Sequence, residues 1–196
     1  AIFSDLTLEW LDPVGEEADI KALMRALRSL SDKVTLLDEE LYLLGVRGVR
    51  CLFGGEQPLF DRAIALVQSL GHIGYGAIAD DPIAAAALAR ARHRPPIVAP
   101  FGGAMALSTL PVHSLQPSSE ALAFLRSVGV ESVGQLAALD RSGVAERLGG
   151  EGVILHRLSQ GESVTEISWG GEYFEPFTER CSLDVPTSTV QQIIEV

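Results

Sequence analysis

Apolar residues recur every three or four positions in several stretches of the chain, which is the pattern of amphipathic helices. Residues 17–30 predict one such helix, with its apolar face at Ile20, Leu23, Met24, Leu27 and Leu30. Residues 58–70 predict a second, with Pro58 in the first turn, where a missing N–H costs little. Asp81-Pro82 predicts the cap and first position of an alanine-rich helix that ends near Arg92.

Short apolar runs between these helices predict β-strands over 6–12, 34–37, 41–46, 73–80 and 96–100. The second and third of these runs flank Asp38-Glu39-Glu40, a short charged turn, and so predict a hairpin. The resulting order is β-α-β-β-α-β-α-β. It indicates an α+β fold in which residues 1–104 form a sheet with helices on one face.

The pattern changes after Leu110, where short helices alternate with glycine-bearing turns and strand signals disappear. We therefore expect residues 105–162 to form a separate, small all-α domain. From Glu162 onward the chain is acidic and again rich in β-formers. Residues 163–196 are expected to be a linker followed by the start of another segment.

Residues 125–139, LRSVGVESVGQLAAL, predict a helix-hairpin-helix arrangement. Gly129 permits a turn with positive φ, and Ser132 can cap the second helix. Amide groups that point outward from such a turn make a phosphate site that grips nucleic-acid backbone and reads no sequence. An ordinary helix pair with a glycine turn is the alternative. The candidate DNA-binding residues are Val128, Gly129, Val130, Glu131, Ser132, Val133, Gly134 and Arg141.

Composition narrows the class of protein. Hydrophobic residues make up 47% of the 196 positions, so the chain should fold around a real core. No apolar run approaches the ~18 residues of a membrane-spanning helix, and no signal peptide is expected. The only cysteines, Cys51 and Cys181, have no metal-site or disulfide spacing, which favours a cytoplasmic setting.

The formal net charge of −11 argues against a free-standing nucleic-acid binder. However, the acidity lies at the two ends. Residues 1–56 carry 11 acidic and 6 basic side chains, and residues 161–196 carry 7 and 1, so the stretch between them is neutral. A central surface could therefore still meet phosphates.

The motifs CLFGGE (51–56), IADDPIAAAALAR (78–90), LPVHSL (110–115) and LHRLSQGE (155–162), with the helix-hairpin-helix between the last two, resemble Y-family DNA polymerases. The likeness is greatest to the ImuB type, the polymerase-like proteins of bacterial mutagenesis systems. It implies a partial palm over 1–104, lacking the first palm strand and the fingers. It also implies a thumb over 105–162 and the entrance to a little finger after that.

The resemblance also implies where catalytic acids should lie, and the sequence departs from that pattern. Counting back from Phe53, the family's metal-binding Asp-Glu pair falls on Glu40 and Leu41. Leucine cannot bind magnesium, which takes oxygen ligands. Asp38-Glu39 is an acidic pair displaced by two residues, and a shift of two keeps the same strand face. A solvated hairpin turn is the simpler interpretation of these acids. No catalytic residue, metal site or cofactor is predicted.

Other candidate sites are weaker. The four histidines are scattered without helical pairing, and Gly54-Gly55 and Gly102-Gly103 lack the lysine of a phosphate loop. Arg90, Arg92, His93 and Arg94 form a basic cluster at the end of a predicted helix. It could contact phosphate, or it could simply complement the helix dipole.

We therefore expect a non-catalytic polymerase-like protein that binds primer-template DNA and acts as an adaptor in translesion synthesis and DNA repair. By resemblance, its partners would be a sliding clamp, an error-prone polymerase and a RecA-like protein, contacted through parts outside this segment. It would be cytoplasmic and nucleoid-associated when active. The alternatives are an interaction scaffold that binds no DNA, and a fragment of an active polymerase.

Overall fold

The computed structural model describes residues 13–38, 40–162 and 167–169, and it has the predicted α+β character. Helix α1 (Pro13–Leu27) precedes an antiparallel hairpin of β1 (Val34–Asp38) and β2 (Leu41–Leu44). A 3-10 turn, η1 (Arg50–Phe53), leads into α2 (Glu56–Ser69). The chain then runs through α3 (Pro82–Arg90), α4 (Gly103–Ser108) and the 3-10 turn η2 (Val112–Leu115). The last helices are α5 (Ser119–Ser127), α6 (Val133–Ala137) and α7 (Arg141–Ser159).

The hairpin over residues 34–44 is confirmed. Val34 pairs with Leu44 and Leu36 with Tyr42, and the ladder is irregular between Leu36 and Asp38, beside the turn. The cap of α3 is also as predicted, because the Asp81 carboxylate accepts a hydrogen bond from the amide of Ala84. The predicted strand 6–12 lies outside the described residues.

Two other predicted strands are wrong. Residues 73–80 and 96–100 make a single parallel bridge, between Ile78 and Ile97, rather than a ladder with the hairpin. The reason is the lack of a neighbouring strand. Alternating apolar residues favour a strand, but a strand forms only where a second strand lies alongside and its backbone groups form hydrogen bonds with the first. In the described part of the chain, the one sheet contains only β1 and β2.

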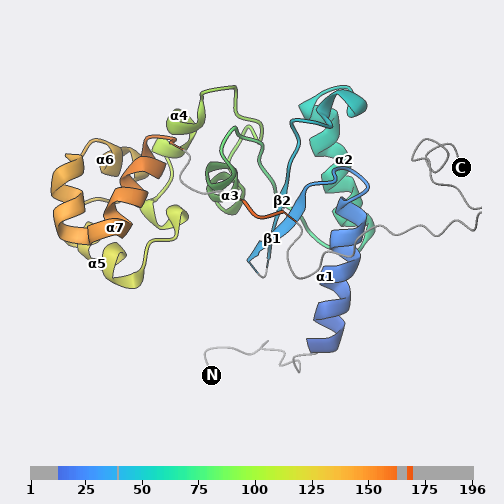
Figure 1. The fold of residues 1–196 in the computed structure, drawn as a ribbon, viewed down its shortest axis with the longest axis horizontal. Coiled ribbons are helices and arrows are strands. Elements are labelled where there is room, and N and C mark those ends of the chain that lie inside the picture. The colour runs from blue at the N-terminus through green and yellow to red at the C-terminus, as the bar shows by residue number, and fades with distance from the viewer. Residues whose placement is uncertain (1–12, 39, 163–166, 170–196) are drawn as a thin grey trace, which may run out of the picture.

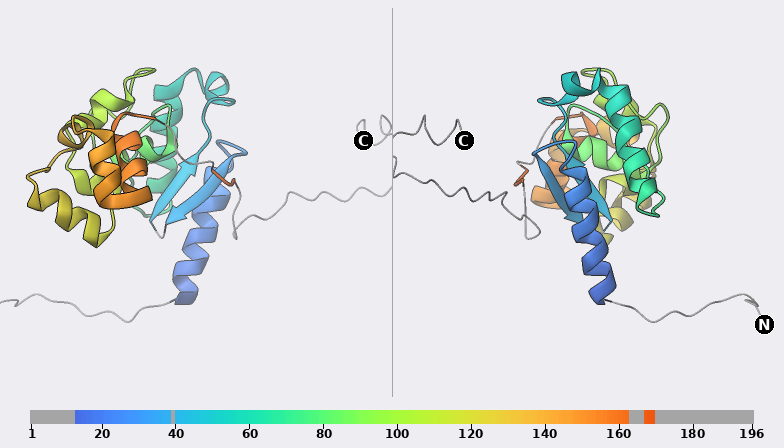
Figure 2. Two further views of the ribbon diagram at one scale, coloured as in Figure 1. Left: turned by 60° about the vertical axis from the view of Figure 1, so that its left-hand side comes forward. Right: turned by 90° about the vertical axis from the view of Figure 1, so that its right-hand side faces the viewer.

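Buried side chains form two clusters. In Figure 1, α1, α2 and the hairpin lie toward the right of the ribbon and α5, α6 and α7 toward the left, with α3 between them. Met24, Leu27, Leu30, Val34 and Leu59 make the smaller one, which joins α1, α2 and the hairpin. Figure 2 shows these three elements together from two further directions. The larger cluster joins α3 to the helices that follow, through residues that include Leu88, Leu107, Leu125 and Leu136. Helix α3 therefore shares a core with the helical region, although it precedes residue 105.

Within the described residues, no helix is both long enough and apolar enough to span a bilayer.

Candidate functional site

The turn between α5 and α6 has the predicted backbone conformation. Gly129 has φ of 80°, a left-handed value that favours glycine, and an added Cβ there would meet no atom within 4 Å. Val130 and Val133 are buried, whereas Val128 is 53% exposed. Of the two valines that flank Gly129, only Val130 therefore packs into the core between the helices.

Ser132 caps α6 in a capping box with Gln135. Its hydroxyl accepts a hydrogen bond from the Gln135 amide at 3.2 Å, and the Gln135 side chain reaches back. The Oε1 atom of Gln135 accepts from the amides of Glu131, at 2.7 Å, and Ser132, at 3.0 Å. The spacing Ser-x-x-Gln is a recognised capping signal, so this contact was readable from the sequence.

The expectation of outward-pointing free amides in this turn is wrong for six residues. Glu131 and Ser132 donate to Gln135, as just described. The amides of Val128, Gly129 and Val130 donate to carbonyls within α5, and the Val133 amide donates to the Leu110 carbonyl at 2.9 Å. Each of these amides has an acceptor inside the protein. A short turn that packs against a core shields its amides from water, and a shielded amide without an acceptor would destabilise the fold.

Gly134 has a packing role in the structure. A Cβ at this position would lie 2.9 Å from the carbonyl oxygen of Ser108, so glycine allows α6 to approach the end of α4 closely. Arg141 is exposed and lies on another element, at the first position of α7. The preceding Asp140 caps that helix, and hydrogen bonds from Ser142 and the Gly143 amide lower the pKa of its carboxyl group.

The hairpin acids are arranged differently from a metal centre. The Asp38 carboxylate forms an ion pair with Arg90 at the end of α3, a contact between residues 52 positions apart in the sequence. Partial burial raises the pKa of Asp38, but Arg90 and the amides of the turn outweigh that effect and leave the pKa below its ordinary value of 3.8. The side chain of Leu41 has no oxygen, Glu40 is exposed, and Glu39 lies outside the described residues. No group of three metal-binding side chains occurs in the part of the chain that the structure describes.

Two of the three arginines in the basic cluster at residues 90–94 make contacts within the protein. Arg90 pairs with Asp38, and the guanidinium of Arg92 lies 3.9 Å from the centre of the Tyr75 ring, a cation–π contact. Arg94 is exposed. The structure thus gives two of these arginines a structural role.

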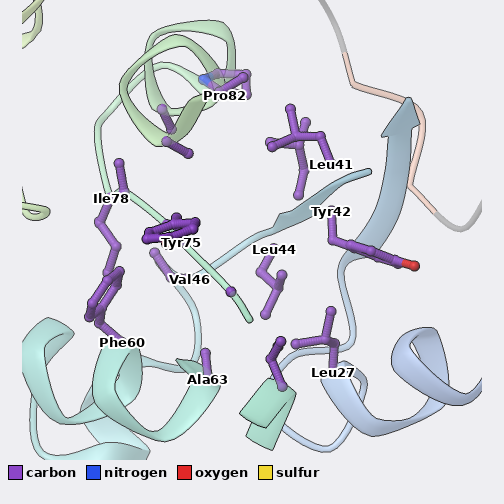
Figure 3. Close-up of a pocket in the computed structure, with 18 of the residues that line it drawn as sticks. Leu27, Leu41, Tyr42, Leu44, Val46, Phe60, Ala63, Tyr75, Ile78 and Pro82 are labelled. Carbon is purple, nitrogen blue, oxygen red and sulfur yellow. The ribbon is translucent and has the colours of Figure 1, made fainter. Parts of the chain in front are cut away.

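A groove that the sequence analysis did not predict runs along the hairpin, α2, α3 and the extended segment 73–80, and charged side chains such as Asp38, Glu56 and Arg90 line it together with apolar ones. Figure 3 shows side chains that line it from each side, among them Leu44 of β2, Phe60 of α2 and Tyr75. Its volume is about 2430 Å³. Pockets for small ligands are typically only ~300–1,000 Å³, so this groove is not shaped for one small molecule. Its residues are distant in sequence, so no local motif could have revealed it.

The fold is similar to those of solved DNA polymerases. The chain is similar to DinB from Sulfolobus solfataricus, with a TM-score of 0.63 over 77% of this chain and 46% of that one. It is also similar to the Dbh DNA polymerase of an insertion ternary complex, with a TM-score of 0.65 over 80% of this chain and 47% of that one. Sequence identity is 16% in both comparisons. The fold is thus that of part of a Y-family DNA polymerase.

Sequence similarity then points to a particular type. The chain is 29% identical over its whole length to Protein ImuB of Caulobacter vibrioides, from two strains. It spans 43% of the length of those relatives. No protein-family model matches it. The resemblance predicted from the motifs, to Y-family polymerases and to the ImuB type, is confirmed.

Proposed function

We propose that this protein is a non-catalytic, polymerase-like component of DNA-damage tolerance that binds DNA backbone and positions other proteins for translesion synthesis. The observation that carries the proposal is the pairing of a Y-family fold and ImuB similarity with an altered acid site. Leucine stands at position 41, beside the single acid Glu40, and the carboxylate of the displaced acid Asp38 has a guanidinium as its counter-ion. Two-metal phosphoryl transfer needs carboxylates free to clamp two cations.

The proposed DNA contact is the turn formed by residues 128–134, with Arg141. Gly129 and Glu131 are exposed there, and Arg126 and Arg141 bring positive charge to the neighbouring helices α5 and α7. Phosphate contacts of this kind would be non-specific in sequence and sensitive to salt. The protein would act on DNA in the cytoplasm, with a sliding clamp, an error-prone polymerase and a RecA-like protein as its proposed partners.

The test is a fluorescence-anisotropy titration of labelled primer-template DNA with the wild type and with Gly129→Asp, at two salt concentrations. We expect binding that weakens steeply with salt and is lost in the variant, because the new carboxylate would repel phosphate. Gly71→Asp is the matched control: Gly71 is also exposed, has φ of 87°, and has no atom within 4 Å of the position that a Cβ would occupy. Equal loss in both variants, or no binding at low salt, would contradict the DNA contact.

Catalysis is tested separately by primer extension with Mg²⁺ and all four nucleotides. We expect no extension under conditions in which the DNA is bound. Extension by the purified protein would overturn the non-catalytic assignment and favour a fragment of an active polymerase.

One observation favours a second function, that of an interaction scaffold without DNA binding. Six amides of the proposed DNA-contacting turn are already bonded within the protein, and the chain has a net charge of −11. A scaffold would show no salt-dependent DNA binding, yet would still bind a protein partner. The titration above separates the two functions.

A further inference from the structure

Two arginines at the end of α3 contact elements that belong to the other core. The Arg90 guanidinium pairs with Asp38 of β1, and that of Arg92 lies over the Tyr75 ring. Helix α3 is buried in the larger cluster, whereas the hairpin packs on the smaller one. Helix α3 also touches β2, so the two arginines act together with that packing. One helix end thus joins the two core regions.

The chain passes from one core region to the other just after Tyr75. Before that point it lies against α2, because a Cβ added at Gly74 would be 2.9 Å from the Cγ1 atom of Val67. After it, Ala77 and Ala79 pack against the larger cluster. Tyr75 therefore lies on the α2 side of the crossing, and the Arg92 guanidinium reaches it from the opposite side.

The backbone of Arg92 is strained, which distinguishes it from an ordinary surface arginine. Its amide donates to the Ala89 carbonyl at 3.0 Å. The His93 amide donates to the Leu88 carbonyl at 2.9 Å, which completes the Schellman pattern of a helix end. Arg92 occupies the left-handed position of that pattern with φ of 52°, where glycine is usual. Such strain persists where the surrounding contacts hold it, and the Tyr75 ring provides such a contact.

We propose that Arg90 and Arg92 form a clasp that holds the two core regions in one arrangement, and that the regions move relative to each other about residues 75–77 when both contacts are released. Each contact alone is weak, because Asp38, Arg90 and Tyr75 are all partly exposed. The clasp fixes the hairpin and the groove beside it relative to the turn at 128–134. It does so whether or not that turn contacts DNA, so the inference goes beyond the proposed function.

The test measures the distance between two spin labels, one in each core region, by pulsed electron paramagnetic resonance. One label is attached to Cys51, an exposed thiol of η1, and the other to Ala123→Cys, an exposed position of α5. Cys181→Ser removes the remaining thiol. We expect one narrow distance distribution in this background protein. Arg90→Gln/Arg92→Gln should broaden it and add a second population.

Arg94→Gln/Arg147→Gln is the matched control, because it removes the same charge from two exposed arginines. It should keep the narrow distribution. An unchanged distribution in a folded Arg90→Gln/Arg92→Gln variant, or two populations already in the background protein, would overturn the clasp. DNA binding is judged by its own titration in either case.

Arg92→Gly separates release of the clasp from damage to the fold. Glycine accepts φ of 52° without strain, so the end of α3 should be kept or stabilised while the contact with Tyr75 is lost. The distribution should broaden, although less than in the double variant. If the double variant fails to fold by circular dichroism, Arg92→Gly decides, and a distribution as narrow as that of the background protein contradicts the clasp.

Discussion

Gln135 determines how the turn between α5 and α6 uses its backbone. Its side-chain oxygen accepts two amides, and its own amide donates to Ser132. These bonds lie at the start of a helix of only five residues, which is too short to be stable without its cap and the burial of Val133 and Leu136. The capping box therefore sets the geometry of the turn that we propose as the DNA contact.

Ser132→Ala should lower the free energy of unfolding by about 1 kcal/mol, since it removes the N-cap acceptor of α6. Urea unfolding followed by circular dichroism measures the change. Ser127→Ala provides the comparison, because the Ser127 hydroxyl bonds only to a carbonyl near the exposed end of α5. That variant should differ from the wild type by less than ~0.5 kcal/mol. If the two variants lose the same free energy of unfolding, the N-cap of α6 does not contribute the stability expected of it.

The Asp38–Arg90 ion pair makes stability depend on pH at the acidic end. Because the pKa of Asp38 is depressed in the fold, its contribution is present above the ordinary value of 3.8 and is lost as pH falls through the depressed pKa. Both side chains are partly exposed, so solvent screens the pair.

Arg90→Gln should therefore cost about 0.5 kcal/mol in free energy of unfolding at pH 6 and less at pH 2, where Asp38 is more protonated. Urea unfolding at the two pH values measures the difference. Arg94→Gln, which changes an exposed arginine four residues further on, should have little effect at either pH. A cost for Arg90→Gln that is the same at both pH values would mean that packing of the side chain, and not its charge, matters.

At the scale of elements, α4 and α6 are held close by a glycine. Gly134→Ala would place a Cβ 2.9 Å from a backbone carbonyl oxygen of α4, and backbone cannot move aside as a flexible side chain can. We expect a loss of about 1–3 kcal/mol in the free energy of unfolding, measured by urea titration. Gly150→Ala has open space around it and directly follows the non-helical Gly149 that kinks α7, so it should change the free energy of unfolding by less than ~0.5 kcal/mol. Destabilisation by both would reflect a general intolerance of alanine and not the α4–α6 contact.

The hairpin and α3 illustrate what element patterns can and cannot predict. The short apolar runs and the charged turn between them were sufficient to predict β1 and β2, because the two strands that pair are only a few residues apart in the sequence. The segment 73–80 has a similar pattern but no adjacent described strand on its side of the groove. Its conformation was therefore decided by distant neighbours.

At the scale of the whole molecule, the larger core joins α3 to the helices after residue 105. Ala84, Ala87 and Leu88 of α3 are almost completely buried in it. A fragment of residues 105–162 would lack α3 and would expose the apolar side chains that pack against it. Small domains bury a smaller fraction of their surface and are only marginally stable. The predicted boundary at residue 105 can be examined directly on this basis.

We expect residues 80–162, expressed alone, to give a cooperative urea transition and high helicity by circular dichroism. Residues 105–162 should show less helicity and no clear transition. If the shorter fragment unfolds at the same urea concentration as the longer one, α3 is dispensable and the helical region is an independent domain as the sequence predicted.

By itself, the sequence determined the features that depend on neighbouring residues: most helices, the hairpin, the positive φ of Gly129, the cap at Ser132 and the family motifs. Such features arise from contacts a few positions apart, so a linear pattern carries them. Only the tertiary structure decided that the turn amides are internally bonded, that Arg90 meets Asp38, that Gly134 touches α4 and that a groove lies beside β2. Those outcomes depend on which distant surfaces pack together, and packing is a property of the folded chain as a whole.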